Sequence, residues 1–235
     1  MIRTSRLPLL RPGYGVMAAM RNLLVGLALL AACATPQTAG ADLRILAFGD
    51  SLVQGYGLPE DQGFVPRLEA WLASNGGADI AVTNAGVSGD TTAGGLARIE
   101  WALADNFDAV IVVLGGNDML RGLDPAHVRA NLDGILDATD AAGLPVLLAG
   151  VPVVANYGEA YANDFRAIFR DLAAEHGSVL YPSFFAGMGG GRSPAEVMGL
   201  MQPDGIHPNA EGVEAIVAGI GPSVLELVEI VQSRR

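Results

Sequence analysis

Ser51 is the residue of this chain whose surroundings best suit nucleophilic chemistry. It ends the tripeptide Gly49-Asp50-Ser51, which directly follows the mainly apolar segment 43–48. That segment is typical of a buried strand, and the glycine indicates a sharp turn after it. Because ligand crevices in open α/β sheets lie at the carboxyl ends of strands, we expect the hydroxyl to project into one. A serine hydroxyl is a weak nucleophile unless a base takes its proton, so another segment must supply that base.

His207 is the best candidate for the base among the three histidines of the chain. It lies in the loop 202–209 (QPDGIHPN), which two prolines stiffen, and Asp204 stands three residues before it. A turn at Gly205 would bring the carboxylate beside the imidazole, so that one ring nitrogen stays protonated while the other accepts the serine proton. The alternative is that Asp204 only caps a turn and that His207 is a structural donor.

The other basic residues offer no competing chemistry. His127 and His176 lie at the ends of predicted helices, where we interpret them as surface or capping residues. The chain has neither H-x-H nor H-E-x-x-H spacing, so a metal-dependent hydrolase is poorly supported. All 14 basic residues are arginine, which excludes a phosphate-loop lysine and a Schiff-base lysine. The sequence therefore predicts no metal and no cofactor.

Acyl transfer also needs donors for a developing oxyanion, and two further strand ends offer them. Gly86, after the predicted strand 80–82, can present its N–H without a side chain in the way. Asn117 follows the apolar segment 108–114 and carries an uncharged amide. Each could instead be an ordinary turn residue. Since Ser51, Gly86 and Asn117 all fall at carboxyl ends of strands, all three can face one crevice.

The elements that must position these residues alternate between strand and helix along the chain. This alternation, with short links, predicts one α/β domain: a doubly wound three-layer fold whose parallel sheet is covered by helices on both faces. The final helix is expected to break near Gly221-Pro222. The expected strands are 43–49, 80–82, 108–114, 145–151 and 178–181, and the expected helices are 62–75, 92–103, 125–142, 159–175, 194–201 and 210–231.

Residues 1–41 are predicted to be a leader, and 42–235 to be the folded domain. A basic start at Met20-Arg21-Asn22 followed by LLVGLALLAA is typical of a signal peptide and too short to span a bilayer. The true translation start is expected at Met17 or Met20 rather than Met1. The domain is therefore expected to be exported, either periplasmic or secreted.

Two processing sites compete within this leader. Ala39-Gly40-Ala41 would release a soluble protein that begins at Asp42. Leu30-Ala31-Ala32-Cys33 resembles the bacterial lipobox, which would put a lipid on Cys33 and tether the domain to a membrane. Both possibilities stay open. Cys33 is the single cysteine, so no internal disulfide is expected in either case.

The chain is strongly acidic, with a formal net charge of −11. Four of the 14 arginines precede Asp42, the first acidic residue, so removal of the leader would leave 10 arginines against 25 acids and a charge of −15. Such a surface repels nucleic acids and anionic membranes. The sequence therefore predicts no nucleic-acid partner. The acyl-transfer chemistry predicts a small-molecule substrate, and the sequence does not predict an oligomeric state.

Four segments together resemble the sequence blocks of the SGNH/GDSL hydrolases. Within that family the likeness is to bacterial periplasmic esterases called arylesterase or multifunctional thioesterase/lysophospholipase, a branch that NYGEAY and MQPDGIHP also fit. The four segments are GDSLVQGYG at 49–57, NAGVSGDTTAGGLAR at 84–98, LGGNDMLRGL at 114–123 and DGIHPN at 204–209.

The resemblance implies a flavodoxin-like α/β/α sandwich with a five-stranded parallel sheet. It implies Ser51 as nucleophile, His207 as general base and Asp204 as the residue that orients it. It also implies an oxyanion hole of the Ser51 N–H, the Gly86 N–H and the Asn117 amide. The implied reaction is hydrolysis of aryl esters, acyl thioesters or lysophospholipids through an acyl-enzyme on Ser51, without a cofactor.

The substrate is less well defined than the chemistry. The glycine-rich segment 186–192 indicates a mobile segment near the site. Ten apolar residues on or near the loops could border an acyl groove, although several could instead belong to the core: Leu58, Phe64, Met119, Leu120, Leu123, Val153, Tyr157, Phe184, Phe185 and Met188.

Three alternatives accompany this hypothesis. A carbohydrate O-acetyl esterase would belong to the same family. A flavin-binding flavodoxin-like protein would use 49–57 to cradle a phosphate, but it gives Asp204 and His207 no role. A non-catalytic binding protein would keep the fold without turnover, which the complete set of Ser51, Asp204 and His207 disfavours.

Overall fold

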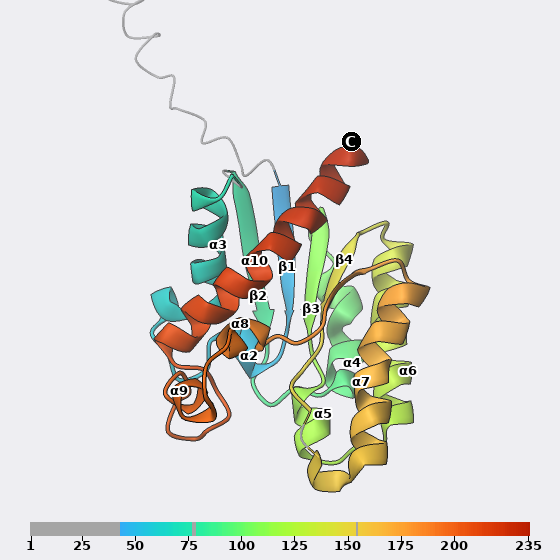
Figure 1. The fold of residues 1–235 in the computed structure, drawn as a ribbon. Helices are drawn as coiled ribbons and strands as arrows, with labels where there is room; N and C mark the ends of the chain where they lie inside the picture. Colours follow the sequence, from blue (N-terminus) through green and yellow to red (C-terminus); the bar gives the residue numbers. More distant parts are fainter. Residues whose placement is uncertain (1–42, 77–78, 154) are drawn as a thin grey trace, which may run out of the picture. The chain divides into compact units, whose positions relative to one another are not determined.

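The computed structural model describes residues 43–76, 79–153 and 155–235, and a five-stranded parallel sheet lies at their centre (Figure 1). The predicted leader 1–41, its two processing sites and Cys33 lie outside the described residues. The predicted fold class, a flavodoxin-like α/β/α sandwich, is confirmed. The strands are β1 (Leu43–Gly49), β2 (Ile80–Gly86), β3 (Ala109–Val113), β4 (Val146–Ala149) and β5 (Val179–Tyr181), in the order β2-β1-β3-β4-β5.

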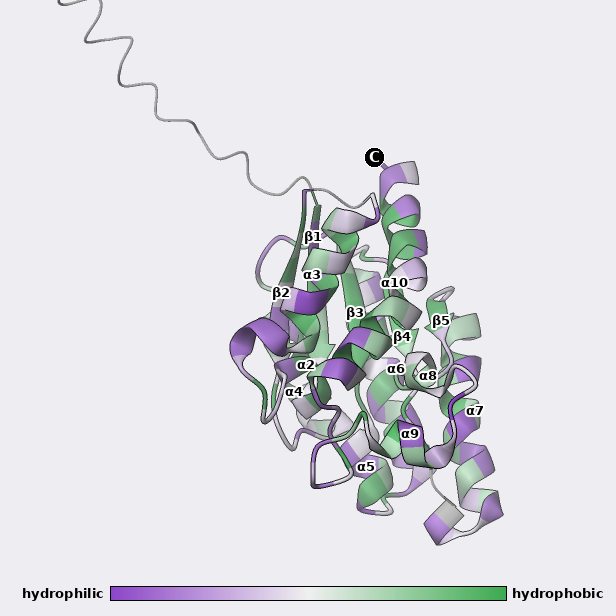
Figure 2. Cartoon of the chain, turned by 60° about the vertical axis from the view of Figure 1, so that its left-hand side comes forward, coloured by the Kyte–Doolittle hydropathy of each residue, from purple (hydrophilic) through white to green (hydrophobic). Residues whose placement is uncertain are grey.

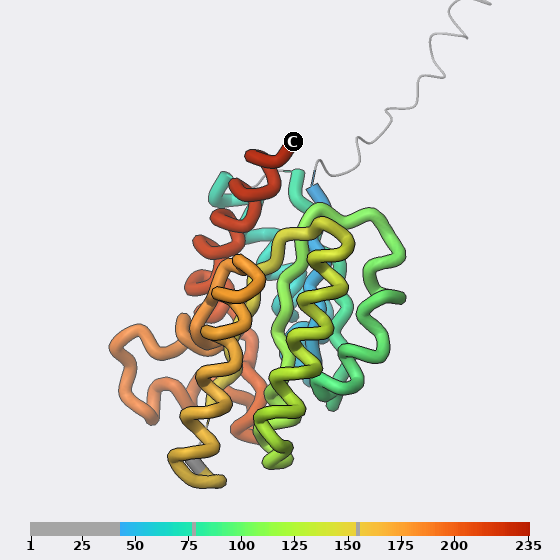
Figure 3. Tube along the Cα trace, turned by 90° about the vertical axis from the view of Figure 1, so that its right-hand side faces the viewer, coloured from blue at the N-terminus to red at the C-terminus, as the bar shows by residue number. Residues whose placement is uncertain are grey.

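Helices cover both faces of this sheet. On one face lie α3, α8 and α10, and on the other lie α4, α6 and α7, of which α6 and α7 run side by side (Figure 3). The helices are α2 (Ser51–Gln54), α3 (Phe64–Ser74), α4 (Thr92–Ala102), α5 (Gly116–Leu120), α6 (Pro125–Ala141), α7 (Glu159–Glu175), α8 (Ala186–Gly189), α9 (Pro194–Met198) and α10 (Ala210–Ser233), with short 3₁₀ turns at Glu60–Gln62 and Ala155–Tyr157.

Two apolar cores, one on each side of the sheet, explain the composition of the strands. Along β1, Ile45 faces the core under α3 and α10, whereas Leu46 faces the core under α4, α6 and α7. Every residue of β3 is buried, as a central strand covered on both faces requires. The strands are accordingly mainly hydrophobic in Figure 2, while the helices carry both hydrophobic and hydrophilic residues.

The predicted break in the last helix is wrong. Helix α10 runs unbroken through Pro222, which lacks the N–H that would bond to Ala218. Its apolar side is buried from Val213 to Val231, and this burial compensates for the missing hydrogen bond. The helix also passes close to α3, because a Cβ built on Gly221 would lie 2.5 Å from the indole of Trp71.

The register of the sheet brings its carboxyl ends to one edge. Gly49, the last residue of β1, lies opposite Gly86 of β2 and Val113 of β3. The segments that follow these three strands therefore begin side by side. None of the helices that the structure describes combines the length and apolarity that a membrane span requires.

Candidate active site

Ser51 lies at the amino end of α2, directly after β1. The turn requires glycine before it, because a Cβ on Gly49 would lie 2.4 Å from the carbonyl oxygen of Val113. Asp50 caps the helix, and its Oδ1 accepts the Leu52 N–H at 3.0 Å. As the first residue of α2, Ser51 presents a backbone N–H that has no acceptor within its helix.

The structure brings Ser51, His207 and Asp204 together. The Nε2 of His207 lies 2.9 Å from the Oγ of Ser51, and its Nδ1 lies 2.7 Å from the Oδ2 of Asp204. The two partners of the imidazole are separated by more than 150 positions in the chain, so only the fold can place them here. An ionised carboxylate can only accept, so Nδ1 of the neutral ring carries the proton and Nε2 can accept one from the serine.

Asp204 is held in this position by its own loop. Gly205 adopts a φ of +66°, and Oδ1 of Asp204 accepts the N–H groups of Ile206 and His207 at 2.9 and 3.0 Å. The hydrogen bond with the His207 side chain, together with these backbone donors, lowers the pKa of Asp204 to about 2. The carboxylate therefore stays ionised throughout the neutral range.

The loop that carries His207 is anchored by residues that sequence reasoning did not single out. The Gln202 side chain donates from Nε2 to the carbonyl oxygens of Tyr56 and Pro208, at 2.8 and 3.0 Å. The ring of Tyr56 packs against the imidazole with 4.7 Å between centroids. Asn209 caps α10 by accepting the Gly212 N–H. The sequence feature that could have indicated a role for Gln202 and Asn209 is that each lies next to one of the two prolines of this loop.

Asn117 lies in α5 and, like Ser51, lines the cavity. A turn at Gly115, with a φ of +116°, leads from β3 into this short helix. The amide donates from Nδ2 to the Oδ2 of Asp50 at 3.3 Å. Only 2% of Asp50 is exposed, and burial raises the pKa of its carboxyl to about 6.

Gly86, the other expected oxyanion donor, does not line the cavity that contains Ser51. Its N–H donates to the Oδ1 of Asn84 at 2.9 Å, and Gly86 lines a separate hollow beside Trp101. A Cβ on Gly86 would lie 2.2 Å from the backbone nitrogen of Gln54, so this glycine permits close packing of β2 against α2. Ser88 and Gly89, two and three residues further on, line the cavity that contains Ser51.

Arg98 of α4 holds the Gly89 loop against the sheet, another role that the sequence did not indicate. Its Nε donates to Oδ2 of Asp90 at 2.8 Å, and its Nη atoms donate to the carbonyl oxygens of Ala85 and Gly49 at 3.0 and 2.8 Å. Its guanidinium also stacks over the ring of Phe48, 3.9 Å from the centroid. One side chain thus ties together the ends of β1 and β2 and the loop between β2 and α4.

The cavity at Ser51 has a volume of about 510 Å³ and a mainly apolar lining. Of the ten apolar residues expected at an acyl groove, Met119, Leu120 and Phe185 line it. The other seven do not: Phe64, Phe184 and Met188 are buried in the core, and Leu58, Leu123, Val153 and Tyr157 lie outside the lining. The remaining apolar lining, which sequence reasoning missed, consists of Leu52, Tyr56, Pro152, Val197, Met198, Met201 and Ile206.

Comparison with known proteins shows the family of this chain. Residues 47–215 match the model of the GDSL-like lipase/acylhydrolase family. The chain belongs to this family.

Relatives of this family member carry esterase names. Esterase TesA of Pseudomonas aeruginosa is 39% identical over 210 residues, which are 89% of this chain and all of that protein. Thioesterase 1/protease 1/lysophospholipase L1 of Escherichia coli K12 is 35% identical over 200 residues, covering 83% of this chain and 88% of the relative. The crystal structure of TesA superimposes with a TM-score of 0.71, covering 78% of this chain and 99% of that one.

These findings confirm the predicted resemblance and the predicted enzyme class, a carboxylic ester hydrolase. The flavin-binding and non-catalytic alternatives gain no support from them. The geometry around Ser51 is the arrangement that acyl transfer requires: a nucleophile, a base within hydrogen-bond distance, and a carboxylate behind the base.

Proposed function

We propose that this family member hydrolyses carboxylic esters through an acyl-enzyme on Ser51. The observation that carries the proposal is the 2.9 Å separation of Ser51 Oγ and His207 Nε2, with Asp204 bonded to the far side of the imidazole. In the first step Oγ attacks the ester carbonyl carbon while Nε2 takes its proton. The C–O bond to the leaving alcohol then breaks, and His207 returns the proton to that oxygen.

The second half of the reaction repeats the proton transfers with water. His207 takes a proton from a water molecule as that water attacks the acyl-enzyme, and then returns it to Ser51 as the carboxylic acid leaves. Asp204 stabilises the imidazolium that forms in each half, since its low pKa keeps it ionised. A thioester would follow the same route with a thiol as the leaving group.

We propose an oxyanion hole made of the Ser51 N–H, the Asn117 amide and the Gly89 N–H, with Gly89 in place of Gly86. Gly89 lines the cavity, and among the described residues its N–H donates no hydrogen bond. The Gly86 N–H is already bonded to Asn84. Donors of this kind are each worth roughly 100- to 1,000-fold in turnover.

The apolar lining supports an acyl chain rather than a sugar ring as the group bound beside Ser51. Apart from backbone, the polar side chains at the cavity are those of Asp50, Tyr56, Ser88 and Asn117 and of the proposed catalytic residues Ser51, Asp204 and His207. A sugar would leave many of its hydroxyl groups without partners there. We therefore favour aryl esters, acyl thioesters and lysophospholipids over acetylated carbohydrates.

A chain-length series of p-nitrophenyl esters, assayed on protein that begins at Asp42, tests this proposal. Medium-chain esters are expected to have a higher kcat/KM than the acetate. Faster hydrolysis of acetylated sugars than of any medium-chain ester would support the carbohydrate esterase instead.

We also propose that residues 1–41 direct export and that 42–235 form the exported hydrolase. The signal-peptide pattern supports this, and the two processing sites predict different masses. Intact-mass measurement of the membrane fraction distinguishes a lipid on Cys33 from cleavage after Ala41.

A further inference from the structure

We propose that Asp50 is a positioning residue that sets which end of the Asn117 amide faces the reacting ester, an inference that rests on the proposed oxyanion hole. Oδ2 of Asp50 accepts from Nδ2 of Asn117 at 3.3 Å. Asp50 is the single hydrogen-bond partner of the Asn117 side chain among the described residues. Asp50 and Asn117 both line the cavity beside Ser51.

An asparagine amide can adopt two orientations of nearly the same shape, related by a flip that exchanges its oxygen and nitrogen. Only the orientation with nitrogen toward Asp50 leaves a second N–H for an oxyanion. The flipped orientation would turn a carbonyl lone pair toward the same place and repel the developing charge. A neighbouring group must therefore select between the two orientations of the amide.

An ionised carboxylate makes that selection because it can only accept. The flipped amide would put Oδ1 of Asn117 against Oδ2 of Asp50, which is repulsive in a site where Asp50 is almost fully buried. Burial raises the pKa of Asp50 to about 6, and hydrogen bonds from Leu52 and Asn117 oppose that rise. The carboxyl is consequently ionised at neutral pH and acts as an acceptor there.

The second carboxylate oxygen holds Asp50 in place. Oδ1 accepts the Leu52 N–H at 3.0 Å and caps α2, the helix that carries Ser51. One buried side chain thus connects the amino end of the nucleophile helix to the oxyanion donor on α5.

The Asp50→Asn variant separates these two contacts. Asparagine is as good a helix cap as aspartate, and its Oδ1 can still accept from Leu52. Its amino group would then face Asn117 and favour the flipped amide. We expect kcat for a p-nitrophenyl ester to fall on the order of 100-fold, with KM changed by less than about 3-fold, since the lost interaction exists only in the transition state.

A double-mutant cycle with Asn117→Ala supplies the decisive comparison. If Asp50 acts through Asn117, the double variant is no slower than Asn117→Ala alone. Asp118→Asn is the matched control: Asp118 is a buried acid that bonds to Thr92 instead, so its loss removes a nearby charge without touching the Asn117 amide. Its kcat is expected to stay within a few-fold of the parent enzyme.

The outcomes distinguish this inference from the proposed function. Wild-type kcat in Asp50→Asn, or an undiminished Asp50→Asn effect in the Asn117→Ala background, would overturn the inference alone. Wild-type kcat in Asn117→Ala would instead refute the oxyanion role on which it rests. Should Asp50→Asn fail to fold in a thermal melt, Asp50→Ser keeps a capping oxygen too short to reach Asn117 and is expected to give the same loss of kcat.

Discussion

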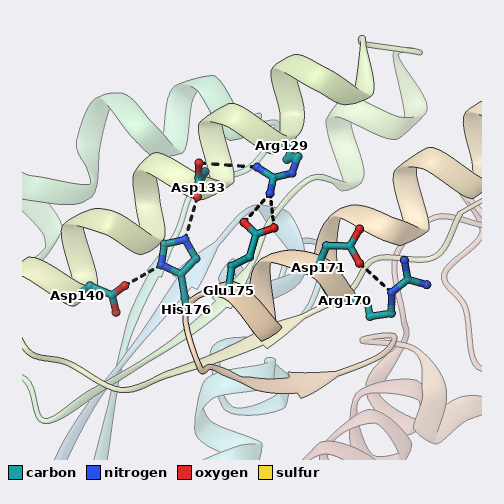
Figure 4. Close-up of polar contacts among 7 residues, drawn as sticks. All are labelled: Arg129, Asp133, Asp140, Arg170, Asp171, Glu175 and His176. Carbon is teal, nitrogen blue, oxygen red and sulfur yellow. Dashed lines mark hydrogen bonds and ion pairs between the residues drawn. The ribbon is translucent and has the colours of Figure 1, made fainter.

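His176 and Asp140 join the carboxyl end of α7 to α6, with 2.7 Å between Nδ1 and Oδ2 (Figure 4). The other ring nitrogen, Nε2, lies 2.8 Å from the Oδ1 of Asp133. A neutral imidazole has one N–H and cannot donate to both carboxylates, so this geometry favours the imidazolium. Partial burial lowers the pKa of His176, but the hydrogen bonds to Asp140 and Asp133 outweigh it, and the net pKa is raised.

This arrangement predicts a pH-dependent contribution to stability. Because the folded pKa of His176 lies above the ordinary value of 6.5, the contribution is complete below that value and is lost as pH rises through the folded pKa. His176→Gln is therefore expected to lower the free energy of unfolding more at pH 5 than at pH 9. The difference is roughly 1 kcal/mol, because water screens the exposed carboxylates. Urea denaturation across this pH range measures it.

His127→Gln is the control for that experiment. His127 is exposed and makes no side-chain hydrogen bond to any described residue, so its replacement is expected to have the same small effect at both pH values. A pH-independent effect of His176→Gln would show that the imidazolium is not the stabilising form.

Ser51→Ala is expected to abolish turnover of aryl esters and labelling by a fluorophosphonate probe, because no other described hydroxyl lies against the His207 Nε2. Circular dichroism should show an unchanged fold. Ser74→Ala, at the exposed end of α3, is the matched control and should keep full activity. Labelling of folded Ser51→Ala at wild-type rates would reject the nucleophile assignment.

Gly86→Ala is expected to destabilise the protein by about 1–3 kcal/mol, the usual cost of overpacking, because the new Cβ would meet the backbone of Gln54. Gly189→Ala places its Cβ in open space and should change stability by less than about 0.5 kcal/mol. Chemical denaturation compares the two. Equal stability of both variants would contradict the close packing of β2 on α2.

Val197→Phe is expected to shorten the acyl chain that the cavity accepts. Val197 lines the cavity from α9, and added volume there competes with the far end of a long chain. We expect kcat/KM for a long-chain p-nitrophenyl ester to fall about 10-fold or more, while the acetate changes little, since pocket contacts are worth about 1–3 kcal/mol per methylene. An equal fall in kcat/KM for both esters would show that the acyl chain of the substrate does not bind beside Val197.

Local sequence patterns were sufficient to predict the central strands and the candidate catalytic residues of this protein. The mainly apolar segments 43–48 and 108–114 predicted central strands because a strand covered on both faces buries most of its side chains in apolar surroundings. Asp204 and His207 lie three residues apart in a proline-stiffened loop, so their pairing could be predicted from spacing. Ser51 could be proposed as their partner because strand ends in such sheets meet at one edge.

The roles of the two glycines and the course of the last helix depended on packing between elements, which local pattern does not show. Gly86 ends β2 and Gly89 lies three residues further on, and only the contacts of Gly86 with Asn84 and Gln54 distinguish the packing residue from the cavity residue. Pro222 would end an isolated helix, yet the core holds α10 intact around it.

The sequence by itself determined the order of the elements, the family and the residues suited to acyl transfer. Each of these could be predicted from short segments whose residues are neighbours along the chain. The tertiary structure alone decided which groups meet across the chain: Asp50 with Asn117, His176 with two carboxylates of α6, and Met198 and Met201 with the cavity. The physical reason is that such contacts depend on how whole helices pack on the sheet. No local pattern of side chains encodes that packing.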